Sequence, residues 1–301
     1  MRILIALLRL ARPAQWVKNI FVFTALIFSG LALEPASVAA ALIAFAAFSM
    51  ASSAIYFLND YKDMEEDRLH PVKCNRPLAS GRLPRAVGPI GALVLATTAT
   101  LLAGWQLGPV SAGILLTYLA MNAAYSLGLK NLVIIDVLII AAGFVLRILV
   151  GAAAIARLPS TWLILCAVTV SLFLGFTKRR AELNALGDDA SRHRRVLAHY
   201  SAAFLDQAIA IVTAATVVCY ILYTVDDHTV GMVGSRLMLL SVPLVLYGIF
   251  RYLYLVYHDR SGGDPTRTVF TDVPMLLTGA LWSTLCTIII IFGKDIRPFF
   301  M

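Results

Sequence analysis

Charged residues are scarce in this chain. Asp, Glu, Lys and Arg together make up 14% of its 301 residues, whereas a soluble domain carries about 25%. The mean hydropathy is +0.83, and many of the apolar runs between the charge clusters approach the roughly 20 residues that a helix needs to cross a bilayer. The composition therefore excludes an ordinary soluble domain and predicts an integral membrane protein.

Cysteine is also rare, and its positions carry no pattern. The four cysteines (Cys74, Cys166, Cys219 and Cys286) are far apart and form no CxxC pair. Neither a disulfide framework nor a zinc site is therefore expected.

The start of the chain lacks the small-residue cleavage site of a signal peptide. Its first 19 residues, MRILIALLRLARPAQWVKN, are apolar but are interrupted by Arg9, Arg12 and Lys18. We expect this segment to lie as an amphipathic stretch at the membrane interface.

The apolar runs predict an all-α integral membrane fold, in which nine transmembrane helices surround a central cavity in one domain over residues 1–301. The expected helices are 15–33, 37–58, 87–106, 109–128, 133–155, 160–176, 204–225, 235–257 and 272–293. Two connections are long and polar, an acidic one at 59–86 and a basic one at 177–203. Helices 1–4 and helices 5–8 each contain one of them, which suggests two repeats that face a shared cavity, with helix 9 added.

The distribution of Lys and Arg sets the expected orientation. If the N-terminus is cytoplasmic, the inner segments hold 20 of the 25 basic residues and the outer segments hold four, while Arg147 lies within a span. Basic residues favour the cytoplasmic side, so we expect a multi-pass protein of the cell (inner) membrane whose two polar loops face the cytoplasm. Because basic loops beside an anionic leaflet explain the net charge of +8, no nucleic-acid partner is expected. A homo-oligomer is compatible with the sequence.

The acidic connection begins with NDYKDMEEDRLHPVKCNRPLASG, residues 59–81. Asn59, Asp63 and Asp67 are four residues apart, so on a helix they share one face, and Asp60 lies beside them. Carboxylates at this spacing repel one another unless a cation lies between them. Mg²⁺ takes one or two protein carboxylates and completes its shell with water and phosphate oxygens, so the pattern predicts a magnesium site.

Basic residues follow the acids directly, at Arg68, Lys73 and Arg76. Arginine forks and lysine point charges are suited to phosphate groups. The succession of acids and bases at the end of a membrane helix therefore predicts binding of Mg²⁺ and a diphosphate. A solvated loop of mixed charge is the alternative.

The segment 59–81 resembles the first aspartate-rich motif, NDxxDxxxD, of the UbiA superfamily of intramembrane prenyltransferases. YSLGLK, from Tyr125 to Lys130, resembles the YSxxLK motif of the same superfamily. The two motifs match in order and spacing, and the expected helices agree over essentially the whole chain.

The chain departs from the usual superfamily pattern after helix 6, where a second aspartate motif of the DxxxD type is missing. Lys178, Arg179 and Arg180, followed by Glu182, stand there instead. In this the chain is similar to the decaprenyl-phosphate phosphoribosyltransferase branch. Three further segments carry this resemblance: RPAQWVKN at 12–19, GFVLR ending at Arg147, and GGDP at 262–265.

The resemblance implies transfer of 5-phosphoribose from 5-phosphoribosyl 1-diphosphate (PRPP) to a polyprenyl phosphate, with release of pyrophosphate. Catalysis would rest on Mg²⁺ held by Asp60 and Asp63, with Asp67 as the further metal ligand. The other residues that it implies as substrate-binding fall into four groups. Asn59, Arg68, Lys73 and Arg76 would orient the diphosphate; Lys130, Lys178 and Arg179 would bind the acceptor phosphate or the 5-phosphate; Tyr125 and Glu182 would contact the ribose; Lys18 would help to close the site.

Two residues of helix 5 allow two interpretations each. Arg147 lies inside the span, where an arginine is costly and usually faces a polar cavity, so it either contacts a phosphate or pairs with a neighbouring acid. Asp136 lies at the start of the helix, either at the cavity mouth or as a helix cap.

Two other functions are compatible with parts of the sequence. An ordinary UbiA prenyltransferase would use a prenyl diphosphate and an aromatic acceptor, but the missing DxxxD argues against it. A transporter or channel would explain Arg147 but not the acidic motif beside YSLGLK.

Overall fold

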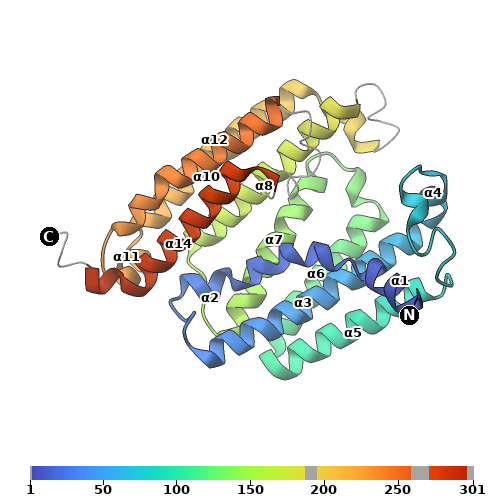
Figure 1. Cartoon of the computed structure of the whole chain (residues 1–301), viewed down its shortest axis with the longest axis horizontal. Coiled ribbons are helices and arrows are strands. Elements are labelled where there is room, and N and C mark those ends of the chain that lie inside the picture. The colour runs from blue at the N-terminus through green and yellow to red at the C-terminus, as the bar shows by residue number, and fades with distance from the viewer. Residues whose placement is uncertain (1, 187–194, 259–270, 297–301) are drawn as a thin grey trace. The chain divides into compact units, whose positions relative to one another are not determined.

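The computed structural model describes residues 2–186, 195–258 and 271–296, and in these ranges the chain is helical without strands. Within these described ranges, eight helices are long and apolar enough to cross a membrane. Figure 1 shows their order along the chain. The spans are Pro35–Lys62, Val87–Leu107, Pro109–Leu127, Ile135–Ala154, Thr161–Asn184, Ala202–Val225, Leu237–His258 and Val273–Gly293. The all-α membrane fold is therefore confirmed.

The helices have the following bounds. They are α1 Arg2–Ala11, η1 Pro13–Phe23, α2 Thr24–Phe28, α3 Pro35–Lys62, α4 Met64–Leu69, η2 Lys73–Asn75, α5 Val87–Leu107, α6 Pro109–Leu127, η3 Leu129–Asn131, α7 Ile135–Ala154, α8 Thr161–Leu186, η5 Arg195–His199, α10 Ala202–Val225, α11 Asp227–Val233, η6 Leu237–Ser241, α12 Val242–His258 and α14 Val273–Ile296.

The chain divides into two compact units. Unit 1 comprises Met1–Leu127 and Leu146–Leu158, and unit 2 comprises Gly128–Val145 and Pro159–Met301. The division falls within α7, so the two halves of this helix belong to different units.

Unit 1 is organised around α3, which packs along α5 (Figure 1). Small side chains line this contact: Ala44, Ala47 and Ala51 of α3 and Ala99 and Ala103 of α5 are all fully buried. Small residues let membrane helices approach closely and gain dispersion contacts. The close packing fixes the end of α3, where the acidic motif begins.

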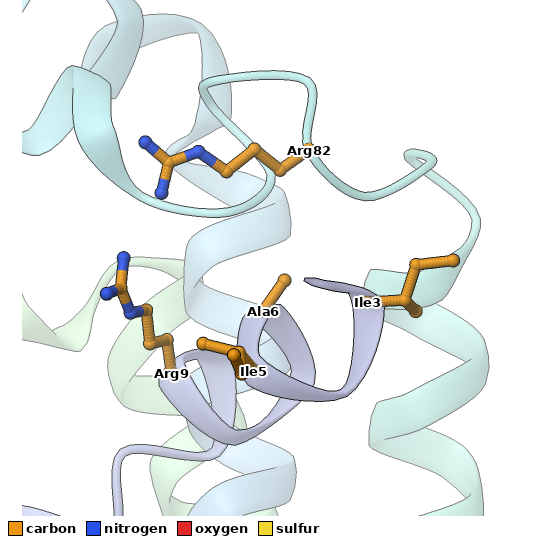
Figure 2. A pocket seen from close by; sticks show the side chains of 5 residues that line it. All are labelled: Ile3, Ile5, Ala6, Arg9 and Arg82. Atoms are coloured by element: carbon orange, nitrogen blue, oxygen red, sulfur yellow. The ribbon is translucent and has the colours of Figure 1, made fainter. Parts of the chain in front are cut away.

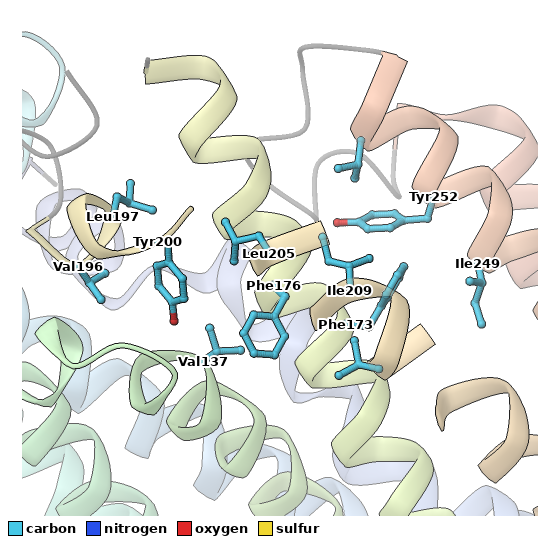
Figure 3. Packing of buried hydrophobic residues seen from close by; sticks show 12 residues of the cluster. Val137, Phe173, Phe176, Val196, Leu197, Tyr200, Leu205, Ile209, Ile249 and Tyr252 are labelled. Atoms are coloured by element: carbon cyan, nitrogen blue, oxygen red, sulfur yellow. The ribbon is translucent and has the colours of Figure 1, made fainter. Parts of the chain in front are cut away.

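Unit 2 has its own core, formed mainly by α8, α10 and α12 (Figure 3). Phe173 and Phe176 of α8 pack with Ile209 of α10, and the Phe173 ring lies 5.4 Å from that of Tyr252 on α12. The start of α7 joins this core through Val137, and Tyr200 follows η5 beside it. The core holds the polar end of α8 against the start of α7.

The predicted helix over 15–33 is matched only in part, and the count of nine spans is not confirmed among the described residues. Residues 13–23 form the 3₁₀ helix η1, and α2 contributes only five α-helical residues. The path of η1 depends on a close contact with α7, because a Cβ added to Gly151 would lie 1.9 Å from the carbonyl oxygen of Val22. Buried hydrogen bonds of Asn19 with α3 hold the same segment.

Two predicted helix ends also lie further along the chain than expected. α3 extends to Lys62, so Asn59 and Asp60 belong to the helix. α8 extends to Leu186, so the predicted basic connection 177–203 begins as a helix that carries Lys178, Arg179 and Glu182. The helical end places these side chains on a rigid element instead of a loop.

Candidate functional site

Two carboxylates of the acidic motif converge in unit 1. Asp60, in the last turn of α3, and Asp67, in α4, are 2% and 3% exposed. The Nη1 atom of Arg76 donates to Asp60 Oδ1 at 3.2 Å and to Asp67 Oδ2 at 2.6 Å. One cationic nitrogen thus bridges the two acids.

A second arginine reaches Asp60 from the N-terminal segment. Arg12 lies between α1 and η1 with a φ of 52°, a left-handed conformation that turns the chain there. Its Nη2 lies 2.5 Å from Asp60 Oδ1, and its guanidinium lies 4.9 Å from the centre of the Tyr56 ring. Arg12 is the first residue of the RPAQWVKN segment, so the structure joins this segment to the acidic motif.

The donor set of this cluster fits one Mg²⁺ ion. Among the described residues no group of three or more His, Cys, Asp or Glu side chains is arranged to hold a metal. Mg²⁺, however, takes only one or two protein carboxylates when phosphates and water complete its shell. Asp60 and Asp67 are two such carboxylates, and the Arg76 nitrogen that both of them contact marks a point within reach of either one.

Asn59 connects the acidic motif to the YSLGLK motif. Ser126, at the end of α6, donates to Asn59 Oδ1 at 2.5 Å, and the ammonium of Lys62 donates to the Ser126 carbonyl. Tyr125 is half-buried beside it. The two motifs that carry the family resemblance are therefore in contact within unit 1.

Three predicted residues of unit 1 lie around the cluster. Asp63 caps the end of α3 through its backbone and is partly exposed. Arg68 is exposed and pairs with Glu65 at 2.8 Å. Lys73 is an exposed residue of η2. The Asp67 backbone amide donates to the Asp63 carbonyl at 2.8 Å, so Asp63 adjoins the cluster through its backbone.

The buried arginine of α7 has polar and aromatic neighbours. Arg147 Nε donates to Asn19 Oδ1 at 2.9 Å, and its guanidinium lies 4.9 Å and 5.5 Å from the ring centres of Phe48 and Tyr118. Cation–π contacts of this kind stabilise a desolvated guanidinium. Asn19 links Arg147 to α3, because its side-chain amide also donates to the Ser49 hydroxyl at 3.0 Å. Lys18, the neighbour of Asn19, is partly exposed.

Unit 2 holds a second charged cluster at the end of α8. Arg179 Nε donates to Asp136 Oδ2 at 2.7 Å, and Arg179 Nη1 donates to Glu182 Oε2 at 2.7 Å. Arg179 and Asp136 are 1% and 0% exposed, whereas Glu182 is only partly buried. Lys178 Nζ lies 3.9 Å from Glu182 Oε1 on the more open side. Arg179 therefore orients Glu182 and leaves Lys178 as the accessible cation.

Tyr200 completes this cluster and was not predicted from the sequence. Its hydroxyl donates to Asp136 Oδ1 at 2.8 Å and accepts from the Ile134 backbone amide at 2.7 Å. Burial raises the pKa of the Tyr200 hydroxyl, which therefore stays protonated as a donor. Asp136 is thus the partner of an arginine and a tyrosine, rather than a simple helix cap.

A third ion pair lies on the exposed side of the α8 end. Arg180 Nε donates to Asp206 Oδ1 at 2.7 Å, and the Tyr257 hydroxyl donates to the same oxygen at 2.7 Å. Arg180 belongs to the basic group identified in the sequence, but Asp206 and Tyr257 carried no sequence signal, because Asp206 lies 26 positions from Arg180 and 51 positions from Tyr257. Lys130, in η3, is partly exposed, and the GGDP segment at 262–265 lies outside the described residues.

Comparisons with known proteins identify the same family that the sequence motifs indicate. The chain matches the UbiA prenyltransferase family over residues 20–291. It is 31% identical to the decaprenyl-phosphate phosphoribosyltransferase of Mycobacterium tuberculosis strain H37Rv over 94% of this chain and 93% of that protein. The protein of the same name from Mycolicibacterium smegmatis is 36% identical over 71% of this chain and 68% of that protein.

A solved structure shares the fold. A UbiA homologue from Archaeoglobus fulgidus, bound to GPP and Mg²⁺, matches with a TM-score of 0.72 at 15% identity, over 95% of this chain and 99% of that chain. At this identity the likeness concerns the fold alone.

Proposed function

The chain belongs to the UbiA prenyltransferase family, and from this premise we propose that it transfers 5-phosphoribose from PRPP to a polyprenyl phosphate of the decaprenyl type and releases pyrophosphate. One observation carries the proposal: relatives named decaprenyl-phosphate phosphoribosyltransferase match nearly the full chain at 31% identity. The cationic end of α8, which replaces the second acidic motif, is consistent with a donor that carries an additional phosphate.

The reaction requires one bond to form and one to break. An oxygen of the acceptor phosphate attacks C1 of the ribose, and the bond from C1 to the diphosphate oxygen breaks, so the pyrophosphate leaves with the electron pair. The acceptor phosphate is already anionic at neutral pH, so no strong general base is required. The protein must therefore mainly position the two substrates and stabilise charge on the leaving group.

In unit 1, we assign the diphosphate to the acidic motif. Asp60 and Asp67 would hold Mg²⁺, with Asp63 at the end of α3 as a further carboxylate. The bound ion would neutralise the leaving diphosphate. The archaeal UbiA homologue of the same fold holds Mg²⁺ and GPP, which supports a divalent ion here. Arg12 and Arg76 already contact the carboxylates. Some of their guanidinium N–H groups would donate to diphosphate oxygens when the donor is bound.

The remaining residues of the acidic motif have supporting roles in this proposal. Asn59 orients the end of α3 through Ser126, and Arg68 and Lys73 supply positive charge at the entrance. Tyr125 is assigned to the ribose and Lys18 to closure of the site. Arg147 is assigned to positioning of η1 through Asn19, with a phosphate contact as the alternative.

In unit 2, we assign the second phosphate and the ribose hydroxyls to the end of α8. Lys178 is the accessible cation there, and Glu182 is a carboxylate that Arg179 holds in one orientation. Carboxylates accept hydrogen bonds from vicinal hydroxyls, whereas a lysine point charge suits a phosphate. Lys130 is a further cation for a phosphate, and the excess of Lys and Arg in the basic connection assigns the end of α8 to the cytoplasmic side, where PRPP would enter.

The experiment that tests the proposal is a donor competition. The purified full chain is reconstituted in lipid nanodiscs with Mg²⁺ and a mixture of polyprenyl phosphates, and is supplied with isotope-labelled PRPP or, separately, with geranyl diphosphate and an aromatic acceptor. We expect mass spectrometry to find a polyprenyl-phosphate phosphoribose, and pyrophosphate to appear in equal amount. Prenylation of the aromatic acceptor without any lipid product from PRPP would overturn the proposal.

A further inference from the structure

A groove on the surface of unit 1 lies apart from the acidic cluster. It has a volume of about 430 Å³ and is lined by Ile3, Ile5, Ala6 and Arg9 of α1 and by Arg82 of the connection before α5 (Figure 2). We call it the α1 groove. Its volume lies in the range of small-molecule sites, which is about 300–1,000 Å³.

The helix that forms the groove is apolar on two faces. Ala6 and Leu10 are buried against Phe57 of α3 and the loop residues Leu78 and Leu83. On the other side of α1 four large apolar side chains are exposed: Ile3, Leu4, Ile5 and Leu8. An apolar helix face beside the charged end of membrane spans is typical of a helix that lies in the interface of a bilayer.

Two arginines flank the apolar floor of the groove. The guanidinium groups of Arg9 and Arg82 lie on the same side of it in Figure 2, and both residues are exposed. Neither guanidinium forms a hydrogen bond or an ion pair with the described part of the chain. In contrast, Arg12 and Arg76 in the same unit are both paired with acids. The groove therefore combines an apolar floor with two uncompensated guanidinium groups.

We propose that the α1 groove binds an anionic phospholipid of the surrounding leaflet. The phosphate and headgroup would lie between Arg9 and Arg82, since the planar guanidinium fork matches phosphate oxygens. The upper part of an acyl chain would lie along Ile3 and Ile5. A zwitterionic lipid satisfies the apolar floor equally well but brings no net charge, so the proposal concerns the anionic headgroup.

The groove is connected to the acidic cluster through a short piece of chain. α1 ends at Ala11, whose carbonyl accepts a hydrogen bond from Ser53 of α3 at 2.9 Å. The next residue is Arg12, which pairs with Asp60. A lipid that fixes α1 would therefore also fix the position of Arg12, but the binding proposal itself does not depend on the reaction proposed above.

Binding can be measured on the full-length protein by native mass spectrometry in detergent, with dioleoyl-phosphatidylglycerol as the anionic lipid and dioleoyl-phosphatidylcholine as the zwitterionic one. We expect the wild type to retain phosphatidylglycerol preferentially. The double variant R9Q/R82Q should weaken its affinity by about fivefold for each arginine removed. The single variant R82Q, which changes only an exposed loop residue, should show a single fivefold step.

Arg157 supplies the matched control. It is also an exposed arginine beside an exposed leucine, Leu158, but lies after the other end of α7 and lines no part of the groove. We expect R157Q to retain phosphatidylglycerol like the wild type. Size-exclusion profiles and far-UV circular dichroism identify any variant that has not folded.

Two results would overturn the proposal. One is that R82Q and R9Q/R82Q retain phosphatidylglycerol as well as R157Q does. The other is that an excess of a polyprenyl monophosphate displaces the phosphatidylglycerol stoichiometrically from the wild type, since the groove would then belong to the lipid substrate. Loss of phosphoribosyl transfer in any of these proteins bears on the reaction and not on this test.

Discussion

Arg179 and Asp136 form an ion pair that is closed off from solvent on both sides. Their contact is 2.7 Å long, and the two side chains are 1% and 0% exposed. Two charges in such a place are tolerated only when further hydrogen bonds satisfy them. Arg179 Nη1 donates to Glu182 Oε2, and the Tyr200 hydroxyl donates to Asp136 Oδ1.

Removal of the Asp136 charge should destabilise unit 2 strongly. In Asp136→Asn the guanidinium of Arg179 stays buried but loses its fully buried counter-ion, and breaking such a pair typically costs about 3–5 kcal/mol. We expect a loss in the free energy of unfolding near the lower limit of that range, because Glu182 remains. Titration with sodium dodecyl sulfate in mixed micelles measures it.

The ion pair of Arg180 with Asp206 is the control for this change. It lies one residue along α8, but Asp206 is 42% exposed. Exposed pairs contribute about 0–1 kcal/mol, so Arg180→Gln should unfold at nearly the wild-type detergent concentration. Equal losses in the free energy of unfolding in the two variants would show that burial of the pair of Arg179 with Asp136 does not increase its effect on stability.

The carboxylates that share Arg76 should be required for activity, whereas their exposed neighbour should not. Asp60→Asn and Asp67→Asn each remove a proposed Mg²⁺ ligand, and we expect turnover to fall by at least about 100-fold. Glu65→Gln changes an acid of the same motif that contacts only Arg68, and it should keep nearly full activity. Radiolabelled PRPP and a polyprenyl phosphate provide the assay.

Removal of the divalent ion by a chelator should distinguish the contribution of Mg²⁺ to turnover from that of the arginines. With excess EDTA the wild type should lose turnover, and added Mg²⁺ should restore it in full. If turnover persists without a divalent ion, Arg12 and Arg76 alone hold the diphosphate, and the assignment of Asp60 and Asp67 as metal ligands is wrong.

The acidic cluster was largely predictable because its signal is local. The apolar run before Asn59 indicates a membrane helix, and the acids and bases that follow lie within 20 residues of one another. Asp60 lies in the last turn of α3 and Asp67 in α4, and the helix break at Asp63 between them lets both carboxylates reach the same nitrogen of Arg76. The helix bounds were less predictable, because α3 continues into the polar motif and ends only at Lys62.

The other contacts depend on residues that are distant in the sequence. The contact of Arg147 with Asn19 spans 128 positions, and that of Tyr200 with Asp136 spans 64. The 3₁₀ path of η1 is likewise imposed by α3 and α7, since its composition alone is that of an apolar membrane helix. Local periodicity contains no information about such partners, so Tyr200 and Asp206 were not identified from the sequence.

The orientation of the chain remains a prediction, and Cys74 offers a direct test. This partly exposed cysteine lies in the connection between α4 and α5, on the side that the excess of Lys and Arg assigns to the cytoplasm. A membrane-impermeant maleimide should label Cys74 in inverted membrane vesicles but not in intact spheroplasts.

The reverse pattern is expected at the opposite end of the spans. Leu158→Cys, introduced together with Cys74→Ser, places a thiol at a position that is 94% exposed between α7 and α8. It should be labelled in spheroplasts. Labelling of Cys74 from outside would reverse the topology and place the acidic cluster away from cytosolic PRPP.

Gly151 should tolerate no side chain, because the backbone of η1 occupies the space beside it. A Cβ at this position would lie 1.9 Å from the carbonyl oxygen of Val22, and a backbone atom cannot rotate away as a side chain can. Gly151→Ala should therefore displace η1 and lower the thermal unfolding midpoint.

Gly113→Ala in α6 is the control, because no atom lies within 4 Å of the new methyl group. Since alanine favours a helix over glycine by about 1 kcal/mol, it should unfold at the wild-type temperature or slightly above it. If the two variants unfold at the same temperature, η1 does not depend on close contact with α7, and the structural explanation for its 3₁₀ path fails.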